Sequence, residues 1–283
     1  MKLIHQKTKT LTTRDNGRSS DAISPNFIYG CLGGCMRSYC YVGRYNFDKV
    51  YFNENVEQIL ESIKRWRDTQ PLAKIPNQVD PKYYTIDIGC STDVPLMSRL
   101  YDWRPVFQFF NASADLKSTF ATKYPSRFNP EAYELAPERH RLRVSLMPQA
   151  YSDVLELGTD PIAKRIQTIL PLSQHMEVHI NYSPIIVEPG WLDHYRDLFR
   201  QVSVAGIKTQ CECIFLTHNK HQHERNSEDV RALLWKPDIQ EEKDSEYAPD
   251  NIRYKWSLKR QYIADFTKVY SEFFDPKTIR YIF

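Results

Sequence analysis

The sequence predicts an α/β protein built on a parallel sheet that is open or partly closed into a barrel. Short β-rich runs alternate with amphipathic segments through most of the chain, and six strands are expected near residues 27–29, 84–88, 118–122, 142–146, 178–182 and 209–215. Six strand–helix units in sequence favour parallel strands joined by right-handed crossovers. Because chemistry in such folds sits at the carboxyl ends of the strands, the loops that follow the strands hold the candidate functional residues.

Helices are expected between these strands, because apolar residues recur at intervals of three and four. The recurrence covers residues 56–66, 162–170 and 192–202. Thr159, Asp160 and Pro161 precede the second of these segments. A capping residue followed by a proline in the first turn is typical of a helix start.

The pattern changes twice along the chain. Residues 1–23 show no apolar periodicity and are expected to form an extended or mobile arm, whereas residues 24–216 hold the strand–helix units. Residues 217–283 are expected to form a C-terminal extension. Its expected parts are a polar stretch, a short helix, a charged loop, a longer helix and an edge strand, at residues 218–225, 227–235, 236–250, 257–274 and 279–283.

Length and composition indicate a globular protein with enough chain for a sizeable core, since 41% of its 283 residues are hydrophobic. No apolar run approaches the roughly 18 residues of a membrane span, and the N-terminus turns polar too quickly for a secretory signal. The six cysteines are clustered and unevenly spaced, unlike a disulfide scaffold, so a reducing cytoplasm is expected. The net charge of +3 is too small to indicate nucleic-acid binding by itself.

Cys31, Cys35 and Cys40 lie together in one glycine-rich stretch. A structural zinc site needs four ligands, and no further cysteine or histidine lies nearby. Three closely spaced thiolates suit a [4Fe–4S] cluster that leaves one iron free for a substrate or cofactor. Gly33 and Gly34 allow the backbone to wrap closely around such a cluster. The alternative is three reduced cysteines in an ordinary loop.

The loops after the first three expected strands carry the cysteine stretch, Cys90 and Lys123, respectively. All three are expected to face one mouth, because the carboxyl ends of parallel strands meet at one edge. The alternatives are that Cys90 is a small buried hydrophobic residue and that Lys123 is solvated. Asp93 is expected to cap a helix after Cys90.

Two further groups are expected to be structural. Cys211 and Cys213 flank Glu212 in a strand, and we expect their side chains to point to opposite faces, so that they do not share a metal. The three histidines of residues 218–223 are expected to lie in a polar surface loop rather than in a metal site.

Residues 253–262 place four positive charges among three aromatic rings, with no acid. Arg253, Lys255 and Lys259 suit phosphate groups, and Trp256 offers a flat ring for a displaced base. The alternative is a helix start with an ordinary solvated cluster of charges.

Several motifs along the chain resemble those of one family. The cysteine stretch that ends in Tyr39-Cys40-Tyr41 resembles the cluster loop of radical S-adenosylmethionine enzymes, and of their spore photoproduct lyase branch in particular. Further motifs resemble that branch in the same order, namely Cys90-Ser-Thr-Asp93, Ala121-Thr-Lys123, Arg143-Val-Ser145-Leu, Glu156-Leu-Gly-Thr-Asp160, Lys164-Arg-Ile166, Pro184-Ile-Ile, Gly190-Trp191, Tyr195 and Arg253-Tyr-Lys-Trp256. The similarity spans roughly residues 24–283.

Two features depart from the family pattern. Four residues, Met36 to Tyr39, separate the second and third cysteines, where family members usually have two, and the region before the cluster is short. The chain therefore resembles a divergent member of the family.

The resemblance implies a partial (β/α)6 TIM-like barrel of the radical S-adenosylmethionine type, with a C-terminal α+β extension. It implies a [4Fe–4S] cluster on the three cysteines, S-adenosylmethionine, an external one-electron reductant such as flavodoxin or ferredoxin, damaged DNA as the partner, and no membrane. The implied activity is that of a cytoplasmic DNA repair lyase, which reverses an ultraviolet-induced thymine photoproduct of the spore photoproduct type.

The resemblance also implies roles for residues. Cys90 returns a hydrogen atom to the product radical, and Tyr41 relays the hydrogen onward, unless Tyr41 only packs against the cluster. The implied cofactor contacts are Lys123, which would pair with the carboxylate, and Tyr39, Ser91 and Ser145. The implied nucleic-acid contacts are Arg253, Tyr254, Lys255, Trp256 and Lys259.

Two other functions stay open at this point. One is a radical enzyme that modifies another substrate, such as a nucleotide, a tRNA base or a peptide. The other is a non-catalytic iron–sulfur protein that binds nucleic acid. Loss of clean repair in a Cys90→Ala variant separates the lyase from the first, and absence of reductive cofactor cleavage favours the second.

Overall fold

The computed structural model describes residues 1–16, 19, 21–40, 42, 48–72, 74–77, 79–243 and 250–283. The chain falls into two compact units, each described by itself below. The first unit comprises Met1–Leu32, Asp48–Val144 and Thr168–His179. The second unit comprises Gly33–Phe47, Ser145–Gln167 and Ile180–Phe283.

The first unit is built on a largely parallel set of strands. They are β2 (Arg14–Asp15), β3 (Ala22–Ile23), β6 (Tyr84–Asp87), β7 (Leu116–Thr122) and β8 (His140–Leu146). β6 pairs in parallel with β3 and β7, β7 pairs in parallel with β8, and β2 pairs antiparallel with β3. β8 is buried along its whole length, which is typical of a parallel strand covered on both faces.

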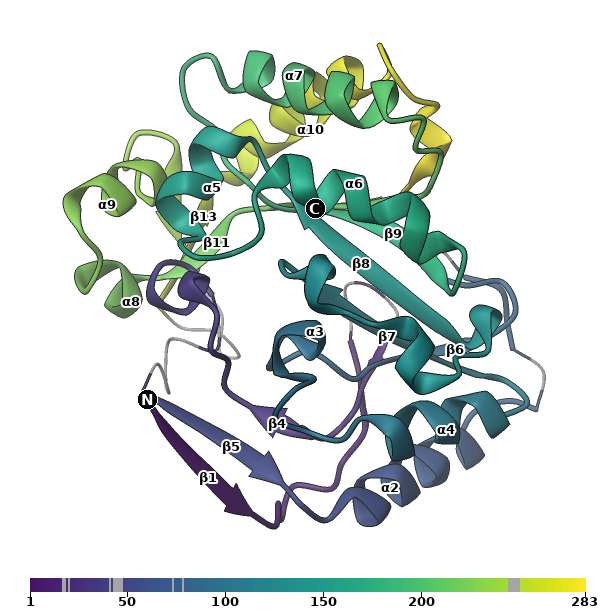
Figure 1. Ribbon diagram of the computed structural model, residues 1–283. Coiled ribbons are helices and arrows are strands. Elements are labelled where there is room, and N and C mark those ends of the chain that lie inside the picture. The colour runs from purple at the N-terminus through teal and green to yellow at the C-terminus, as the bar shows by residue number, and fades with distance from the viewer. Residues whose placement is uncertain are drawn as a thin grey trace. The chain divides into compact units, whose positions relative to one another are not determined.

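The helices of the first unit use the apolar faces that their sequences present. They are α2 (Val56–Asp68), α3 (Val94–Met97) and α4 (Arg104–Ala112), and α2 and α4 lie side by side (Figure 1). Ile59 and Ile63 lie on the buried face of α2, as the periodicity predicts. The buried face of α4 carries two phenylalanines, Phe107 and Phe110.

Residues 1–23 form strands that the sequence does not predict. β1 (Lys2–Gln6) pairs in parallel with β5 (Lys49–Asn53), and β5 pairs antiparallel with β4 (Ile28–Tyr29), which gives a separate small sheet (Figure 1). The strand expected at residues 27–29 therefore exists as β4, but its assignment to the main sheet is wrong, because β3 lies beside β6 instead. β1 is largely exposed, so it lacks an apolar pattern from which it could be predicted.

The second unit continues with parallel strands and two long helices. β10 (Cys211–Phe215) pairs in parallel with β9 (Glu177–Ile185) and with β14 (Ile279–Ile282), which confirms the predicted edge strand. α7 (Trp191–Val204) and α10 (Trp256–Tyr270) lie side by side (Figure 1). Their contact is aromatic, since the rings of Tyr195 and Phe199 each lie 5.3 Å from that of Phe266. Such pairs contribute about 0.5–1.5 kcal/mol beyond the area they bury.

A small antiparallel sheet follows β10 in the second unit. Its strands are, in order, β11 (Thr217–Asn219), β13 (Asn251–Tyr254) and β12 (Gln240–Glu242). The other helices that lie in this unit, wholly or in part, are α5 (Gln149–Leu155), α6 (Ile162–Ser173), α8 (Lys220–Glu224) and α9 (Glu228–Leu234). The predicted short helix at residues 227–235 is thus confirmed, whereas the expected polar stretch before it is a strand and a helix.

Five short 3-10 helices lie among the described residues. They are η1 (Gly34–Arg37), η2 (Pro125–Arg127), η3 (Pro130–Tyr133), η4 (Pro137–Arg139) and η5 (Pro276–Thr278). A proline begins each of the last four, where its missing N–H leaves no bond unmade.

The main sheet has eight strands in the order β14-β10-β9-β8-β7-β6-β3-β2. The predicted α/β class is therefore confirmed, and so are the strands expected at residues 84–88, 118–122, 142–146, 178–182 and 209–215. Within the described ranges, none of the helices has the length and apolar character needed to span a bilayer.

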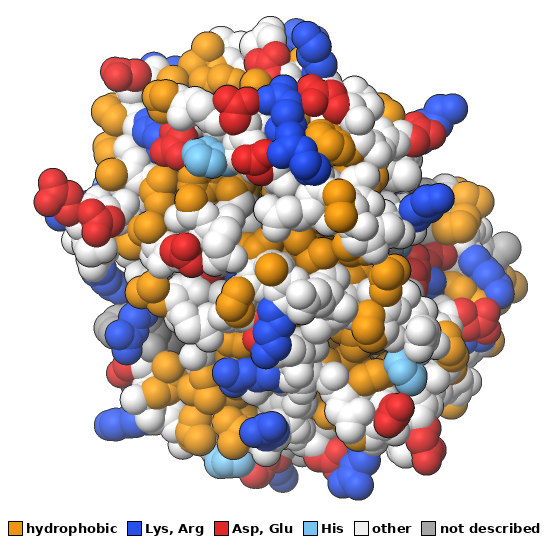
Figure 2. All heavy atoms as spheres, turned by 45° about the horizontal axis from the view of Figure 1, so that its top comes forward, with side chains coloured by type: hydrophobic (Ala, Val, Ile, Leu, Met, Phe, Trp, Pro, Cys, Tyr) orange, Lys and Arg blue, Asp and Glu red, His pale blue; other side chains and the backbone are white. Residues whose placement is uncertain are grey.

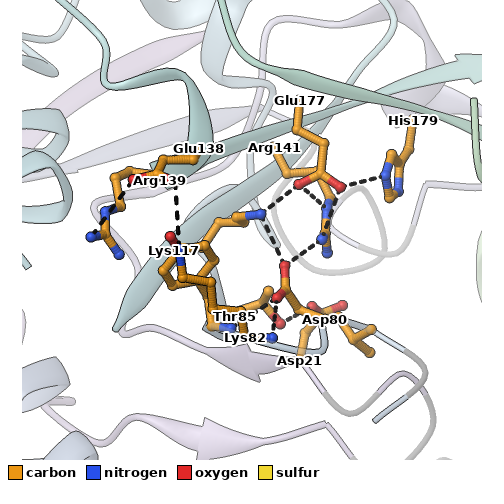
Figure 3. Close-up of polar contacts among 12 residues, drawn as sticks. Asp21, Asp80, Lys82, Thr85, Lys117, Glu138, Arg139, Arg141, Glu177 and His179 are labelled. Atoms are coloured by element: carbon orange, nitrogen blue, oxygen red, sulfur yellow. Dashed lines mark hydrogen bonds and ion pairs between the residues drawn. The ribbon is translucent and has the colours of Figure 1, made fainter. Parts of the chain in front are cut away.

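Buried charges gather at the amino ends of strands in the first unit (Figure 3). Lys117, at the start of β7, places its Nζ 2.9 Å from Asp80 Oδ2 and 2.7 Å from Glu177 Oε2. Arg141, at the start of β8, places its Nη2 2.7 Å from the same Asp80 oxygen. These ion pairs brace the amino ends of the strands, and a functional site is expected at the opposite ends.

Candidate active site

In the first unit, the start of the cysteine stretch contacts the Cys90 turn. The Gly30 N–H donates a hydrogen bond of 3.1 Å to the Ser91 carbonyl. Gly30 has a φ of 112°, and a Cβ there would lie 2.5 Å from the Lys49 carbonyl oxygen, so only glycine fits. The residue that follows, Cys31, is buried. The chain thus brings the first cysteine of the stretch next to the turn that carries Cys90.

Asp93 ties the Cys90 turn to the end of β7. Its Oδ1 accepts hydrogen bonds from Leu96 N at 3.1 Å and from Thr122 Oγ1 at 2.8 Å, and its Oδ2 accepts one from Lys123 N at 2.9 Å. Burial raises the pKa of Asp93, although these donors favour the carboxylate. Asp93 caps α3, as predicted, and it also fixes the backbone of Lys123. Cys90 and Lys123 are half-buried.

In the second unit, Cys35 and Cys40 close a tight turn around η1. The Cys40 N–H donates a hydrogen bond of 3.2 Å to the Cys35 carbonyl. Cys35 is buried, and Cys40 is partly exposed. A Cβ at Gly34 would lie 1.7 Å from the Leu157 carbonyl oxygen, so glycine is required where this turn meets the end of α5. The prediction that a glycine permits close backbone approach in this loop is thus confirmed for Gly34.

Tyr39 is bound to a buried ion pair. Its hydroxyl donates a hydrogen bond to Glu156 Oε1, and Glu156 Oε2 lies 2.7 Å from Arg165 Nη2. Burial and the Glu156 charge raise the pKa of Tyr39 well above its usual value, so the phenol stays protonated. Arg165 also donates to the Asp160 and Ser145 carbonyls at 2.7 and 2.9 Å. Tyr39 therefore connects the cysteine turn to the carboxyl end of β8.

The buried polar atoms of the second unit that lack a hydrogen-bond partner among the described residues include Ser145 Oγ, at 1% exposure, and Asn181 Oδ1, at 7% exposure. Arg141 contacts Glu177, so alternation along β8 and β9 places Ser145 and Asn181 on the same side of the sheet. A buried polar atom without a partner is rare and suits a bound polar ligand. Sequence reasoning missed Asn181, because a single asparagine in a strand gives no signal.

The donor set suits an iron–sulfur cluster better than zinc. None of the six cysteines forms a disulfide, including the three of the glycine-rich stretch. Among the residues that the structure describes, no group of three or more cysteine, histidine or acidic side chains is arranged to hold a metal ion. The fit to a cluster therefore rests on the chemistry of three cysteines in a glycine-rich stretch.

The predicted nucleic-acid residues divide between surface and core. Trp256 is 65% exposed at the first position of α10. Arg253 Nη2 lies 3.2 Å from Glu241 Oε1, and Lys255 Nζ donates to the Asp238 carbonyl at 2.7 Å. Tyr254 lies in the core rather than at the surface. Its ring is buried, and its hydroxyl accepts a hydrogen bond from the Val187 N–H at 2.8 Å.

Lys259 is half-buried. The carboxylate of Glu241 lies beside Arg253, so the charge at that position is mixed. On the one face drawn in Figure 2, Lys and Arg side chains stand among Asp and Glu side chains, so that face carries no uniformly basic surface for nucleic acid.

Two expectations about the second unit are wrong. His218 lies in β11 and is buried, not in a polar surface loop, and burial lowers its pKa to about 3. Cys211 and Cys213 lie on one face of β10, with their sulfur atoms 4.0 Å apart, because residues two apart in a strand point the same way. Both are buried, and Cys211 contacts the Tyr270 hydroxyl at 3.4 Å, which agrees with a structural role.

Tyr41, the residue expected to relay hydrogen, lies outside the described residues.

The chain is similar to known proteins in sequence and in fold. No protein-family model matches the chain. The spore photoproduct lyase of Bacillus subtilis (strain 168) is 24% identical over 199 residues, covering 68% of this chain and 54% of that protein. The chain thus spans about half the length of this curated relative.

Solved structures of spore photoproduct lyase share the fold. One complexed with dinucleoside spore photoproduct has a TM-score of 0.82 at 16% identity, covering 99% of this chain and 82% of that one. A variant with bound AdoMet and dinucleoside spore photoproduct has a TM-score of 0.80 at 16% identity, with the same coverage. The predicted α/β fold therefore agrees with the fold of these solved structures.

The sequence match and the fold agree with the motifs. The chain is thus similar to spore photoproduct lyases in sequence and in fold, in agreement with the motif resemblance.

Proposed function

We propose that the chain is a radical S-adenosylmethionine lyase that reverses a thymine photoproduct in DNA. The observation that carries the proposal is the hydrogen bond from Gly30 N–H to the Ser91 carbonyl, because it holds Cys90 close to the start of the cysteine stretch. A hydrogen donor must lie near the place where the substrate radical forms. The relatives that bind dinucleoside spore photoproduct support this substrate class.

The three cysteines of the stretch, Cys31, Cys35 and Cys40, are the proposed ligands of a [4Fe–4S] cluster. S-adenosylmethionine would be the cofactor bound beside the cluster, in keeping with the relative that binds AdoMet. When bound and reduced by one electron from an external donor, such as flavodoxin or ferredoxin, the pair supplies a 5′-deoxyadenosyl radical for hydrogen abstraction.

Residues of the chain are proposed to orient S-adenosylmethionine. Lys123 offers a positive charge to the cofactor carboxylate, and its backbone is fixed by Asp93. Ser145 offers a buried hydroxyl without a described partner. Ser91 is buried in the turn after Cys90. Tyr39 is a further proposed cofactor contact, and its hydroxyl donates to Glu156, which supports the loop.

Cys90 is the proposed hydrogen donor to the substrate. After the bond between the two thymines breaks, one thymine carries an unpaired electron on carbon. The Cys90 S–H bond breaks homolytically, a C–H bond forms on the thymine, and the unpaired electron moves to sulfur. Tyr41 is the proposed next hydrogen donor: its O–H bond would break, the S–H bond of Cys90 would form again, and the unpaired electron would move to the Tyr41 oxygen. Cys90 is half-buried rather than fully buried.

The C-terminal extension is the proposed nucleic-acid surface. Trp256 is exposed and can stack on a base, while Arg253, Lys255 and Lys259 can contact phosphates. Extruding two linked bases costs a few kcal/mol, and damage lowers this cost. A reducing cytoplasm, which preserves free thiols and the cluster, is the proposed location.

The test is anaerobic incubation of reconstituted protein with ultraviolet-irradiated thymine dinucleotide and isotopically labelled S-adenosylmethionine, followed by mass spectrometry. The expected result is thymine dinucleotide, with label returned to the cofactor or found in thymine. Cofactor cleavage without repair points to a radical enzyme with another substrate. Iron and sulfide uptake without cofactor cleavage points to a non-catalytic iron–sulfur protein. Either result contradicts the proposal.

A further inference from the structure

Two buried amides of the C-terminal extension bind the backbone of the cysteine turn. Gln222 Nε2 donates hydrogen bonds to the Cys40 carbonyl at 3.1 Å and to the Met36 carbonyl at 3.4 Å. Asn226 Nδ2 donates one to the Ser38 carbonyl at 3.1 Å. Gln222 lies on α8, and Asn226 follows it in the connection to α9. Both amides therefore contact the four-residue segment between Cys35 and Cys40, or Cys40 itself.

Burial makes these contacts energetically relevant. Gln222 is 4% exposed and Asn226 is 7% exposed, so each amide has given up water to make its bonds. A buried donor that loses its partner costs about 1–3 kcal/mol. A carbonyl acceptor can be contacted only by the NH2 end of each amide, so the orientation of both side chains is fixed.

A side chain of the segment between Cys35 and Cys40 also holds this segment in place. Ser38 Oγ donates to the Cys35 carbonyl at 3.1 Å and to the Leu155 carbonyl at 2.6 Å. The carbonyls of Cys35, Met36, Ser38 and Cys40 thus each accept a hydrogen bond from a buried side chain. A loop lengthened by two residues has more conformations to lose, and these bonds restrict it to one.

We propose that Gln222 and Asn226 are positioning residues, which preform the turn that presents Cys35 and Cys40 to an iron–sulfur cluster. The inference rests on the proposed function for the identity of the bound group, but the preformed turn is a property of the protein without metal. Groups that bind the backbone around metal ligands fix ligand geometry and adjust the potential of the metal. Hydrogen bonds from Gln222 and Asn226, in the C-terminal extension, thereby stabilise the longer loop of this chain.

The first experiment uses the full-length protein without a cluster and measures alkylation of each cysteine by iodoacetamide, with peptide mass spectrometry. Gln222→Leu and Asn226→Leu keep the approximate side-chain volume and remove the donor. Gln222→Glu and Asn226→Asp keep the shape and place a carboxylate against the carbonyls. Each variant is expected to raise the alkylation rate of Cys35 about tenfold, because local opening of the turn becomes easier.

Cys211 and Cys213 serve as internal probes, because they are buried in β10 away from the turn. Their alkylation rates are expected to stay unchanged. Gln261→Leu is the matched control, since Gln261 is an exposed amide that bonds Asp265 on the same helix. A Cys35 rate equal to that of wild type in all four variants overturns the inference. A parallel rise at Cys211 and Cys213 also overturns it, because the amides would then only stabilise the fold.

The second experiment measures iron and sulfide content, the electron paramagnetic resonance spectrum and the midpoint potential after anaerobic reconstitution. The variants are expected to hold less iron or to shift the midpoint potential, whereas Gln261→Leu is expected to match wild type in both. An unchanged potential and iron content would speak against positioning. Failure of the wild-type protein to take up iron and sulfide contradicts the proposed function. The alkylation experiment still tests whether Gln222 and Asn226 hold the cysteine turn in place.

Discussion

Glu156 and Arg165 form an ion pair at 2.7 Å in which both side chains have no exposed surface. The pair is satisfied on all sides, since Glu156 accepts the Tyr39 hydroxyl and Arg165 donates to the Asp160 and Ser145 carbonyls. Removing two charges from water is costly, and only such a set of hydrogen bonds offsets that cost. The ion pair therefore links the cysteine turn, the loop after α5 and the end of β8 through hydrogen bonds.

Arg165→Met is expected to lower the free energy of unfolding by about 3–5 kcal/mol, because Glu156 would be left buried and unpaired. The measurement is urea denaturation of the protein without cluster. Arg200→Met is the matched control, since Arg200 pairs with Asp197 on the exposed side of α7 and should contribute less than about 1 kcal/mol. Equal losses in the free energy of unfolding from the two substitutions would contradict a stabilising role of the buried Glu156–Arg165 pair.

Cys90→Ala is expected to leave iron and sulfide content unchanged and to divert most turnover to aberrant products. Without the weak S–H bond, the thymine radical has no nearby hydrogen donor and reacts with other partners. Product analysis by liquid chromatography and mass spectrometry checks this. Cys211→Ala is the control, because that thiol is buried against Tyr270 and should leave repair clean. Clean thymine product from Cys90→Ala would rule out Cys90 as the donor.

The sequence predicts the parts of the fold that carry a strong apolar pattern. β7 and β8 are almost fully buried, and α2 and α7 have one apolar face each, so their residues record where they pack. β1 is mostly exposed and is held by pairing with β5, a long-range contact that leaves no local pattern. β3 consists of only two residues, which is too short for any periodicity.

The candidate site shows the same division. Cys31, Cys90 and Lys123 stand in motifs that can be read locally, and Asp93 carries a recognisable cap position. Gln222 and Asn226 are separated from the cysteine turn by more than 180 residues, so their contacts depend on tertiary structure. Without the fold, nothing separates them from ordinary surface amides. The supporting residues of a site are therefore harder to predict than its reactive residues.

Trp256→Ala is expected to weaken binding of single-stranded DNA by roughly tenfold or more, because stacking on one base contributes about 1–3 kcal/mol. Fluorescence anisotropy with a labelled oligonucleotide provides the measurement. Tyr254→Phe is the matched control from the neighbouring position, since Tyr254 is buried and its hydroxyl serves Val187. Equal losses from both substitutions would place the binding surface elsewhere.

Lys255→Ala and Lys259→Ala are expected to reduce the salt dependence of DNA binding. Each phosphate contact that is lost should lower the slope of log affinity against log salt by about 0.7 for a single strand. The comparison requires the same oligonucleotide at several salt concentrations. Arg200→Ala, on the exposed side of α7, is the charge-matched control. A slope that is the same in wild type and both lysine variants would argue against phosphate contacts at these positions.

His140 makes stability depend on pH. Its ring is buried, Nε2 donates to Asn111 Oδ1 at 2.7 Å, and Nδ1 accepts from Ser118 Oγ at 2.8 Å. The ring is therefore neutral, and burial, with the nearby charges of Lys117 and Arg139, lowers its pKa to about 3 from 6.5. Below pH 6.5 the unfolded chain takes up a proton at this residue, whereas the folded protein does not. Stability is thus lost as the pH falls from 6.5 towards 3.

At pH 5 this histidine is expected to lower the free energy of unfolding by about 2 kcal/mol relative to pH 7. His140→Gln keeps an amide that can bond Asn111 or Ser118 and removes the titration, so its unfolding free energy should fall less steeply over the same range. Urea denaturation at pH 7, 6 and 5 measures both slopes. His175→Gln is the control, because His175 is half-exposed and should leave the wild-type slope intact. An identical slope for wild type and His140→Gln would mean that other groups set the acid sensitivity.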